Sequence, residues 1–387
     1  MEIEEAILKH VLRFVPAKSL IRFKSVSKNW YNWISSPFFA HQQATHFTKT
    51  SGFVSQSNHR LCPFFIPLHH HSHGFPSSTS LFFLPESSTI RTTSHGLLCC
   101  KSTFQENTYF ITNPTTQQWT KLPEPTLFHG SATALALAFT PSTYNFYSHF
   151  QLVCAVPFDS VNVVYFEIYS SRTNSWRLAD SQYCYHGDDF RFHGDGFFMD
   201  GSVYWETSNG VVLGFDLKYE EHGEILLPQL PPARHGAVME MNGELCYIMV
   251  ITMKKNEEEN NDYYWLGMYG GGGHDMVLKR RIPLHNYNGD FMTRGDVEGE
   301  VRVLSCLSEG VVMLLVGSDV ILYHVEERKG KFVGKVGPTE LSGISVNDAA
   351  IRFLPYVNTL VRVCPVEEMP PEDRQFDQIL KSITTLI

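Results

Sequence analysis

Charged residues and long apolar runs are both scarce in this chain. Asp, Glu, Lys and Arg make up only 18% of the 387 residues, and 43% are hydrophobic, which excludes a disordered polypeptide. No run approaches the roughly 20 apolar residues of a membrane-spanning helix, and the N-terminus lacks the basic stretch and apolar core of a secretory signal. These absences predict a globular protein of the cytoplasm, the nucleus or both, without a membrane partner.

Paired cysteines are missing as well. The eight cysteines are scattered and form no C-x-x-C, the spacing of many zinc and redox sites. Several lie in apolar runs, as Cys99 and Cys100 do, and this placement favours reduced, buried thiols over a disulfide framework.

Metal-binding and phosphate-binding motifs are also lacking. The histidines of His69–His73 lie in a Pro/Ser/Gly-rich stretch without an acidic or Cys ligand at zinc spacing, which indicates a solvated loop. Gly270–Gly273 is not followed by the Gly-Lys-Ser/Thr of a phosphate loop and is predicted to be a hairpin tip. The sequence therefore predicts no metal and no cofactor.

Acidic clusters offer no catalytic site either. Glu257–Asp262 is a charge run typical of a solvated turn. Asp188, Asp189 and Asp195 could serve acid–base catalysis, but no nucleophile motif such as Gly-x-Ser-x-Gly lies near them, so a polar loop is predicted. We therefore expect a protein that is not itself an enzyme.

The net charge of −9 is unevenly placed. Seven Lys and Arg residues and three Glu give residues 1–50 a charge of +4, so the remainder carries −13. A basic head on an acidic body fits two modules with different partners. The acidic body argues against nucleic-acid binding.

The first 40 residues have helical periodicity, with apolar side chains at spacings of three and four. Val15-Pro16 ends the first of three predicted helices, since a residue before proline avoids the α region, and Pro16 suits the start of the second. Ser27 is the expected N-cap of the third, which ends at Ser36-Pro37. The apolar positions are Ile3, Ile7, Leu8, Val11 and Leu12, then Leu20, Ile21 and Phe23, then Trp30, Trp33 and Ile34.

Such short helices are not expected to bury all these side chains among themselves, and exposed apolar surface usually marks a partner. The alternative is a helical lid on the chain's own domain. The segment resembles the F-box in Pro16, Lys18–Leu20, Arg22–Lys24, Val26–Lys28, Trp30 and Ile34–Pro37. Where that family usually begins with Leu-Pro, this chain has Ile3-Glu4.

The F-box resemblance implies docking onto a Skp-family adaptor, and through it onto the cullin scaffold of a ubiquitin ligase. The residues it implies for adaptor binding are Ile7, Leu8, Leu12, Val15, Pro16, Leu20, Val26 and Trp30 as apolar contacts, with Ser19 and Lys28 as polar contacts.

From Gly52 onward the pattern changes to short strands broken by turn residues. The expected outer-strand residues Trp119, Trp176, Ile225, Val277 and Phe332 are separated by 57, 49, 52 and 55 residues. A strand-rich period near 50 is typical of kelch-type propeller blades. Pairing Gly52–Arg91 with Ile351–Val363 would add a sixth blade and close the ring, with five or seven blades as alternatives.

This repeat region resembles the F-box-associated domain of plant F-box proteins, in Ser94–Cys99, Thr112–Thr115, Phe197–Trp205, Phe215–Leu217 and Phe353–Val357. The predicted fold is a small all-α three-helix module followed by an all-β propeller of about six kelch-like blades. The domains are 1–40 for the F-box, 41–51 for a polar connector, 52–364 for the propeller and 365–387 for a tail. The tail is expected to contain a short amphipathic helix that packs on the propeller, on the F-box helices or on a partner.

The two resemblances together imply a substrate receptor of a Skp–cullin–F-box ubiquitin ligase, whose propeller binds an unidentified target protein. Two alternatives stay open at this point. One is an adaptor-bound scaffold or sequestering protein without ligase function. The other is a propeller lectin or enzyme with a helical lid.

Overall fold

The computed structural model describes residues 10–56, 63–68, 81–187, 189–228, 236–254, 262–271, 273–286, 289–295, 297, 301–307, 310–335 and 353–363. Helices come first and strands follow, in the order that the sequence predicts. The histidine stretch His69–His73 and the predicted tail helix lie outside the described residues.

The N-terminal module contains α2 (Ala17–Phe23), α3 (Lys28–Ile34) and α4 (Pro37–His46), preceded by helical residues at 10–12. The predicted N-cap of α3 is confirmed, because the Ser27 side chain accepts a hydrogen bond from the Trp30 N–H at 3.2 Å. The interior of the N-terminal module is a cluster of buried apolar side chains: Leu12, Ala17, Leu20, Ile34, Phe39 and Ala40.

Helix α4 was not predicted, and it occupies residues 41–46 of the expected connector. Ser36-Pro37 does end the preceding helix, but it also starts the next one. The Ser36 hydroxyl accepts from the Phe39 N–H at 3.2 Å, and Pro37 takes the first helical position, where its missing N–H costs nothing. Ser36 and Pro37 therefore separate α3 from α4 and at the same time begin α4.

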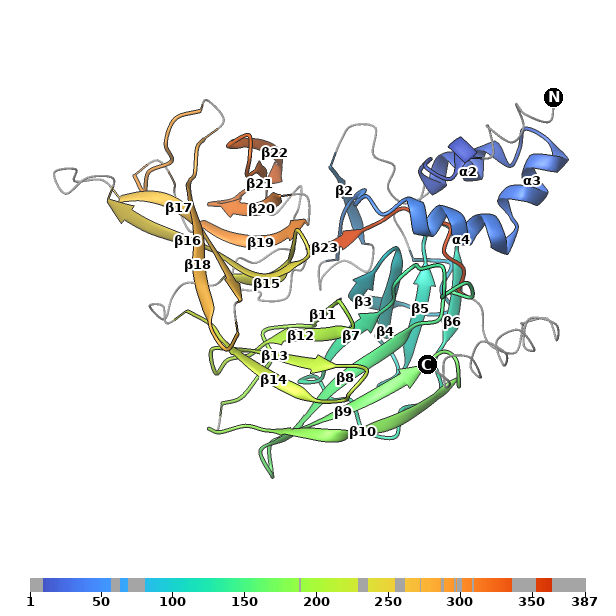
Figure 1. Cartoon of the computed structure of the whole chain (residues 1–387), viewed down its shortest axis with the longest axis horizontal. Helices are drawn as coiled ribbons and strands as arrows, with labels where there is room; N and C mark the ends of the chain where they lie inside the picture. Colours follow the sequence, from blue (N-terminus) through green and yellow to red (C-terminus); the bar gives the residue numbers. More distant parts are fainter. Residues whose placement is uncertain are drawn as a thin grey trace.

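Six antiparallel sheets follow one another around a ring (Figure 1). Five have four strands in sequence order: β3 (Ser88–Ser94), β4 (Leu97–Ser102), β5 (Tyr109–Asn113) and β6 (Gln118–Lys121); β7 (Ala134–Ala138), β8 (Gln151–Phe158), β9 (Val163–Ser170) and β10 (Ser175–Cys184); β11 (Phe197–Met199), β12 (Ser202–Glu206), β13 (Val211–Asp216) and β14 (His222–Leu226); β15 (Ala237–Met241), β16 (Glu244–Lys254), β17 (Asp262–Gly271) and β18 (Met276–Pro283); β19 (Val301–Leu307), β20 (Val311–Val316), β21 (Asp319–His324) and β22 (Lys329–Lys335).

The predicted outer-strand positions are confirmed, since all five lie on the fourth strand of a sheet: Trp119, Trp176, Ile225, Val277 and Phe332. The sixth sheet pairs the two ends of the domain, as predicted, in the order β2 (Phe64–Pro67), β1 (Gly52–Ser55) and β23 (Phe353–Tyr356). The register places Gly52 opposite Tyr356. The architecture is thus a six-bladed β-propeller whose ring is closed by a late strand.

One boundary differs from the prediction. Residues 88–91, grouped with the closing blade on sequence alone, belong to β3 and pair with β4. In the closing blade β23 lies nearest the axis, in contact with β3 and β19.

Aromatic side chains fill the space between neighbouring blades. Phe166 of β9 stacks on Trp205 of β12 at a ring-centroid distance of 6.0 Å and contacts Phe215 of β13 at 4.4 Å. Predicted buried thiols are confirmed at Cys99, Cys100 and three further positions, although Cys184 is exposed. Burial raises the pKa of the Cys100 thiol to about 12, so it stays protonated.

The turns of the blades open on two faces of the propeller. Turns after the first and third strands, such as 95–96, 114–117 and the loop 139–150, form what we call the near face. Turns after the second strand and connections between blades, such as 103–108, 122–133 and 159–162, form the far face. The helical module lies on the near face, where His41 of α4 contacts Phe146 at a ring-centroid distance of 5.1 Å.

Candidate protein-interaction site: the helical module and its seat on the propeller

The ten residues predicted to bind an adaptor have different surroundings in the structure. Ile7 and Leu8 lie outside the described residues. Leu12 and Leu20 are buried within the chain, with exposed fractions of 5% and 0%. The other six reach the surface to different degrees: Val15, Pro16, Ser19 and Trp30 are half-buried, whereas Val26 and Lys28 are exposed.

From residue 10 onward, where the structure describes the module, five apolar side chains are at least half exposed, namely Val11, Phe14, Val26, Tyr31 and Phe38. Val26 is the most open of them, with 63% of its surface exposed in the turn between α2 and α3. Figure 1 shows α3 at the outer edge of the molecule and α4 nearer to the propeller. Apolar surface on a module with its own packed interior is typical of a protein-binding site.

Sequence reasoning missed four of these residues, although α3 carried a usable signal. Trp30, Trp33 and Ile34 share the face that recurs every three to four residues, and Ile34 is buried. Tyr31 lies about 100° away from Trp30 around the helix and is 56% exposed. The position of Tyr31 outside the helix face of Trp30, Trp33 and Ile34 therefore indicates that its side chain is exposed.

The segment that follows β23, residues 357–363, holds the module against the propeller, and we call it the closing segment. Helix α2 has no cap of its own, because Pro16 precedes it. Asn358 supplies one: its carbonyl accepts from the Ala17 N–H at 3.3 Å, and its side-chain oxygen accepts from the Lys18 N–H at 2.9 Å. A residue from the far end of the chain thus satisfies the first donors of α2.

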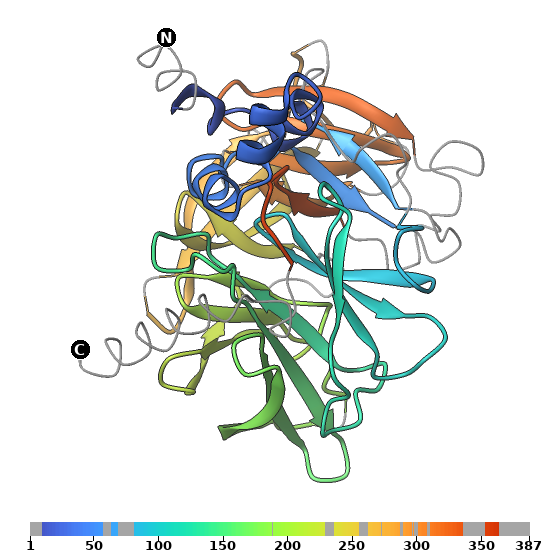
Figure 2. The ribbon, with the colours of Figure 1, turned by 90° about the vertical axis from the view of Figure 1, so that its right-hand side faces the viewer.

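Gln43 of α4 forms a second link. Its side-chain N–H donates to the Val15 carbonyl at 3.3 Å, and its side-chain oxygen accepts from the Leu360 N–H at 2.9 Å. Leu360 joins the apolar cluster of the module. Figure 2 shows the helices beside the closing segment, which is drawn in red.

Asn113, at the end of β5, fixes the closing segment from the propeller side. Its side-chain N–H₂ donates to the carbonyls of Thr359 at 3.0 Å and Val361 at 2.7 Å, and its side-chain oxygen accepts from the Thr115 N–H at 2.9 Å. The residue is fully buried. The closing segment is therefore bonded to helices on one side and to a blade on the other.

Comparison with known families identifies both the helical module and the propeller. Residues 5–42 match the family model of the F-box domain. Residues 68–262, about half of the chain, match the family model described as "F-box protein At3g26010-like, beta-propeller". This chain belongs to the F-box proteins with an At3g26010-like β-propeller. Both resemblances inferred from the sequence are confirmed.

Relatives of this F-box protein occur in Arabidopsis thaliana. F-box protein At5g07610 is 30% identical over 274 residues, which cover 63% of this chain and 63% of the relative. F-box protein At3g26010 is 26% identical over 254 residues, which cover 63% and 59%. The chain thus matches less than two thirds of the length of either relative.

Solved propeller structures are more distant. The α-L-arabinofuranosidase of Fusarium graminearum superposes with a TM-score of 0.36 and 12% identity, over 60% of this chain and 75% of the other. A similarity this low carries no argument about function.

On the far face, away from the F-box, a buried cluster organises the loop 122–133. Glu167 of β9 accepts hydrogen bonds from the Thr126 N–H at 2.7 Å and the Leu127 N–H at 3.2 Å, and from Nε2–H of His129 at 2.8 Å. Tyr109 O–H lies 3.0 Å from Nδ1 of the same imidazole. The Glu167 and His129 side chains are fully buried, so this pair is placed to hold a loop and not to meet a substrate.

Burial alone raises the pKa of Glu167, because a carboxylate loses its hydration there. The donors from His129 and Thr126 outweigh that effect, and the resulting pKa lies below its ordinary value. Glu167 is therefore a carboxylate at neutral pH. It fixes the loop that carries Phe128, whose side chain is 60% exposed.

Two other far-face loops present apolar side chains as well. Phe104 is 75% exposed in the loop 103–108, and Val161 is 57% exposed in the turn 159–162. The His129 N–H donates to the Asn107 side chain at 2.8 Å, which ties the loop of Phe104 to that of Phe128. Together Phe104, Phe128 and Val161 define what we call the far-face patch.

Two of the remaining chemical candidates, Asp195 and the glycine run, have structural explanations. Asp195 forms a two-pronged ion pair with Arg91, at 2.7 and 2.8 Å, that joins β3 to the entry of β11. Gly270 and Gly271 belong to the β17–β18 hairpin, as predicted. Within the described ranges no group of three or more His, Cys, Asp or Glu could hold a metal ion. In the same ranges no helix is long and apolar enough to cross a membrane.

Proposed function

We propose that this F-box protein is the substrate-recognition subunit of a Skp–cullin–F-box ubiquitin ligase. The F-box would bind a Skp-family adaptor and thereby a cullin scaffold, and the propeller would hold the target protein. The subunit itself performs no bond chemistry. Its contribution to ubiquitin transfer is to keep target lysines at high effective concentration near the charged conjugating enzyme.

One observation carries this proposal: the F-box exposes large apolar side chains while its inner face is packed and its seat on the propeller is hydrogen-bonded. Of the predicted contacts, Val26 and Lys28 are exposed and can meet an adaptor directly, whereas Val15, Pro16, Ser19 and Trp30 are half-buried and offer part of their surface. The predicted contacts Leu12 and Leu20 support that surface from beneath in this conformation. Tyr31 and Phe38 join the proposed surface because they are more than half exposed.

Substitution of Val26 by aspartate is expected to weaken adaptor binding by about 30-fold or more. A buried interface anchor typically contributes about 2 kcal/mol, and a carboxylate placed there would add a desolvation cost. The measurement is co-purification of a co-expressed Skp-family adaptor, followed by titration of the purified chains. Leu178→Asp is the matched control, because Leu178 is 46% exposed on β10 of the propeller and should leave binding unchanged.

Equal retention of the adaptor by wild type and Val26→Asp would contradict the proposed contact. Cullin recovery in the same experiment separates ligase assembly from sequestration. Adaptor without cullin would favour the scaffold alternative over the substrate receptor.

The target is expected to bind the far-face patch. The near face is partly covered by the F-box, whereas Phe104 and Phe128 are open on loops that Glu167 and Asn107 hold in place. Scaffold-supported loops are the usual carriers of binding residues in such folds. This placement would also keep the target clear of the adaptor.

The double substitution Phe104→Asp and Phe128→Asp should abolish target recovery without affecting the adaptor. Proximity labelling with the proteasome blocked measures the first quantity, and adaptor co-purification measures the second. Phe332→Asp is the control, because Phe332 is 46% exposed on the outer strand β22. An unchanged labelling profile in the double variant would place target binding elsewhere.

A further inference from the structure

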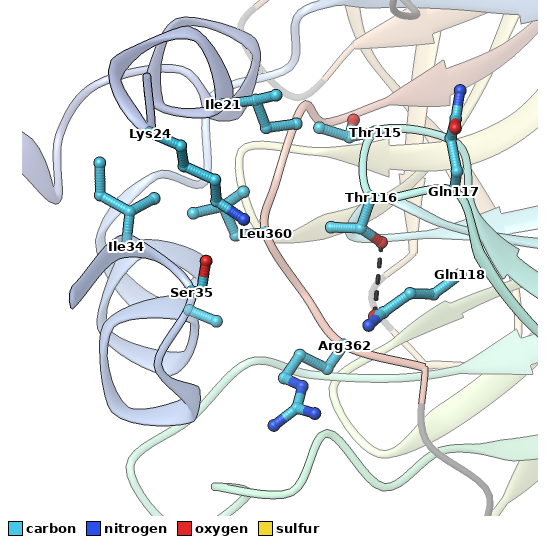
Figure 3. A pocket seen from close by; sticks show the side chains of 11 residues that line it. Ile21, Lys24, Ile34, Ser35, Thr115, Thr116, Gln117, Gln118, Leu360 and Arg362 are labelled. Carbon is cyan, nitrogen blue, oxygen red and sulfur yellow. Dashed lines mark hydrogen bonds between the residues drawn. The ribbon is translucent and has the colours of Figure 1, made fainter. Parts of the chain in front are cut away.

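A cleft of about 320 Å³ opens between the F-box and the propeller (Figure 3). Its apolar side is formed by Ile21, Ile34 and Leu360, which come from α2, α3 and the closing segment. Residues 115–118, which belong to the turn between β5 and β6 and to the start of β6, form the opposite wall with hydroxyl and amide groups. Small-molecule sites in proteins begin at roughly 300 Å³ and combine apolar walls with a few polar groups, so this cleft has the size and lining of one.

The charge of the cleft has one sign. Lys24 of α2 and Arg362 of the closing segment line it, and no lining residue is acidic. Among the described residues neither cation forms an ion pair; Lys24 only lies 5.9 Å from the ring centre of Tyr31. Figure 3 shows Lys24 extending from α2 toward Leu360, with Arg362 on the next stretch of the closing segment.

The surroundings of Lys24 favour an incoming anion. Burial lowers the pKa of Lys24, because its ammonium group is partly desolvated. A bound anion would compensate for that desolvation. Arg362 would add a planar donor pair that suits carboxylate or phosphate oxygens.

We propose that this cleft binds a small amphiphilic anion, with an apolar body against Ile21, the apolar wall residue that is not buried, and a phosphate or carboxylate group attracted by Lys24 and Arg362. Such a ligand would touch the F-box helices, the closing segment and the β5–β6 turn at once. It would therefore stabilise the orientation of the F-box on the propeller. The proposal does not depend on adaptor binding.

Phenyl phosphate is the probe, since it has a ring and a doubly charged group. Isothermal titration of the full-length chain should show saturable binding with a Kd of about 1 mM or tighter, weakening as salt rises. Lys24→Met and Arg362→Met should each weaken it at least tenfold, because each removes a charge and keeps an apolar stem. Lys49→Met, which changes an exposed lysine outside the cleft, should leave the Kd unchanged.

Four results would overturn the proposal. The first is the absence of saturable binding at about 10 mM probe, and the second is an equal Kd in wild type and both cleft variants. The third concerns the chain's own acidic residues Glu367 and Glu368, which follow the closing segment in sequence. If the wild-type chain does not bind the probe but the full-length variant with Glu367→Gln and Glu368→Gln does, those two carboxylates of the chain are the natural occupants of the cleft. Binding of benzyl alcohol as tight as phenyl phosphate would remove the role assigned to charge.

Discussion

Replacing Glu167 by alanine is expected to lower the free energy of unfolding by about 2–4 kcal/mol, because a buried carboxylate that accepts several hydrogen bonds is lost. The substitution leaves the backbone N–H groups of Thr126 and Leu127 and the imidazole N–H of His129 without their acceptor, and the His129 side chain is fully buried. Each unsatisfied buried donor costs about 1–3 kcal/mol. Urea unfolding followed by circular dichroism measures the change.

The pH dependence of this effect has a definite sign. The pKa of Glu167 is lower in the folded protein than its ordinary value of 4.5. Its stabilising contribution is therefore complete above about pH 5 and is lost as the pH falls through the folded-state value. The difference in stability between wild type and Glu167→Ala should be largest near neutral pH and should shrink in acid.

Glu326→Ala is the matched control, because Glu326 pairs with Arg280 but its side chain is 76% exposed. Exposed pairs contribute little, so its unfolding midpoint should equal that of wild type. A Glu167→Ala protein as stable as this control would show that the buried cluster is not needed for the fold. Loss of target binding with retained adaptor binding is the expected functional result, since Glu167 holds the loop of Phe128.

Replacing Asn113 by alanine should lower the free energy of unfolding by about 2–4 kcal/mol and loosen the F-box from the propeller. The change removes both donors that satisfy the carbonyls of Thr359 and Val361, and those carbonyls are enclosed between the helices and the blade. Hydrogen exchange at the Leu360 and Val363 amides is the sensitive measurement. Both amides donate to side chains across this junction, at 2.9 and 3.2 Å, and should exchange much faster in the variant.

Thr116→Ala, in the same turn, is the control for Asn113→Ala. The Thr116 hydroxyl makes only long contacts, at 3.4 and 3.5 Å, so exchange in the closing segment should stay at the wild-type rate. If Asn113→Ala also leaves exchange unchanged, the closing segment is held mainly by Gln43 and Asn358. The same comparison reports whether the F-box and propeller behave as one rigid body.

A fixed junction has a consequence for the proposed ligase. A receptor that swivelled freely would spread target lysines over many positions relative to the conjugating enzyme and lower their effective concentration. Here Asn358, Gln43 and Asn113 connect the two domains through one short segment. We expect variants that break these bonds to slow ubiquitin transfer more than they weaken adaptor binding.

Local signals in the sequence were sufficient for the repeating parts of the fold. Trp119 and Phe332 identified outer strands because every blade repeats the same pattern of strands and turns. Pairing of the two ends followed from the need of a ring to cover its edges. From the sequence, Ser36-Pro37 predicts only the end of a helix. The same dipeptide can also begin the next helix, and only the hydrogen bonds around it in the folded chain show that it does so here.

The sequence alone was enough to predict an F-box, a propeller of about six blades and several buried thiols, because these follow from short-range periodicity and from motifs that lie together along the chain. Tertiary structure alone decided which apolar residues of the F-box face outward, because Leu20 and Val26 are both aliphatic, yet only Leu20 is covered by packed side chains. It also decided that Asn358 caps α2 from 340 residues away. Spacing along the sequence carries no record of such contacts, because they exist only once the ring has closed.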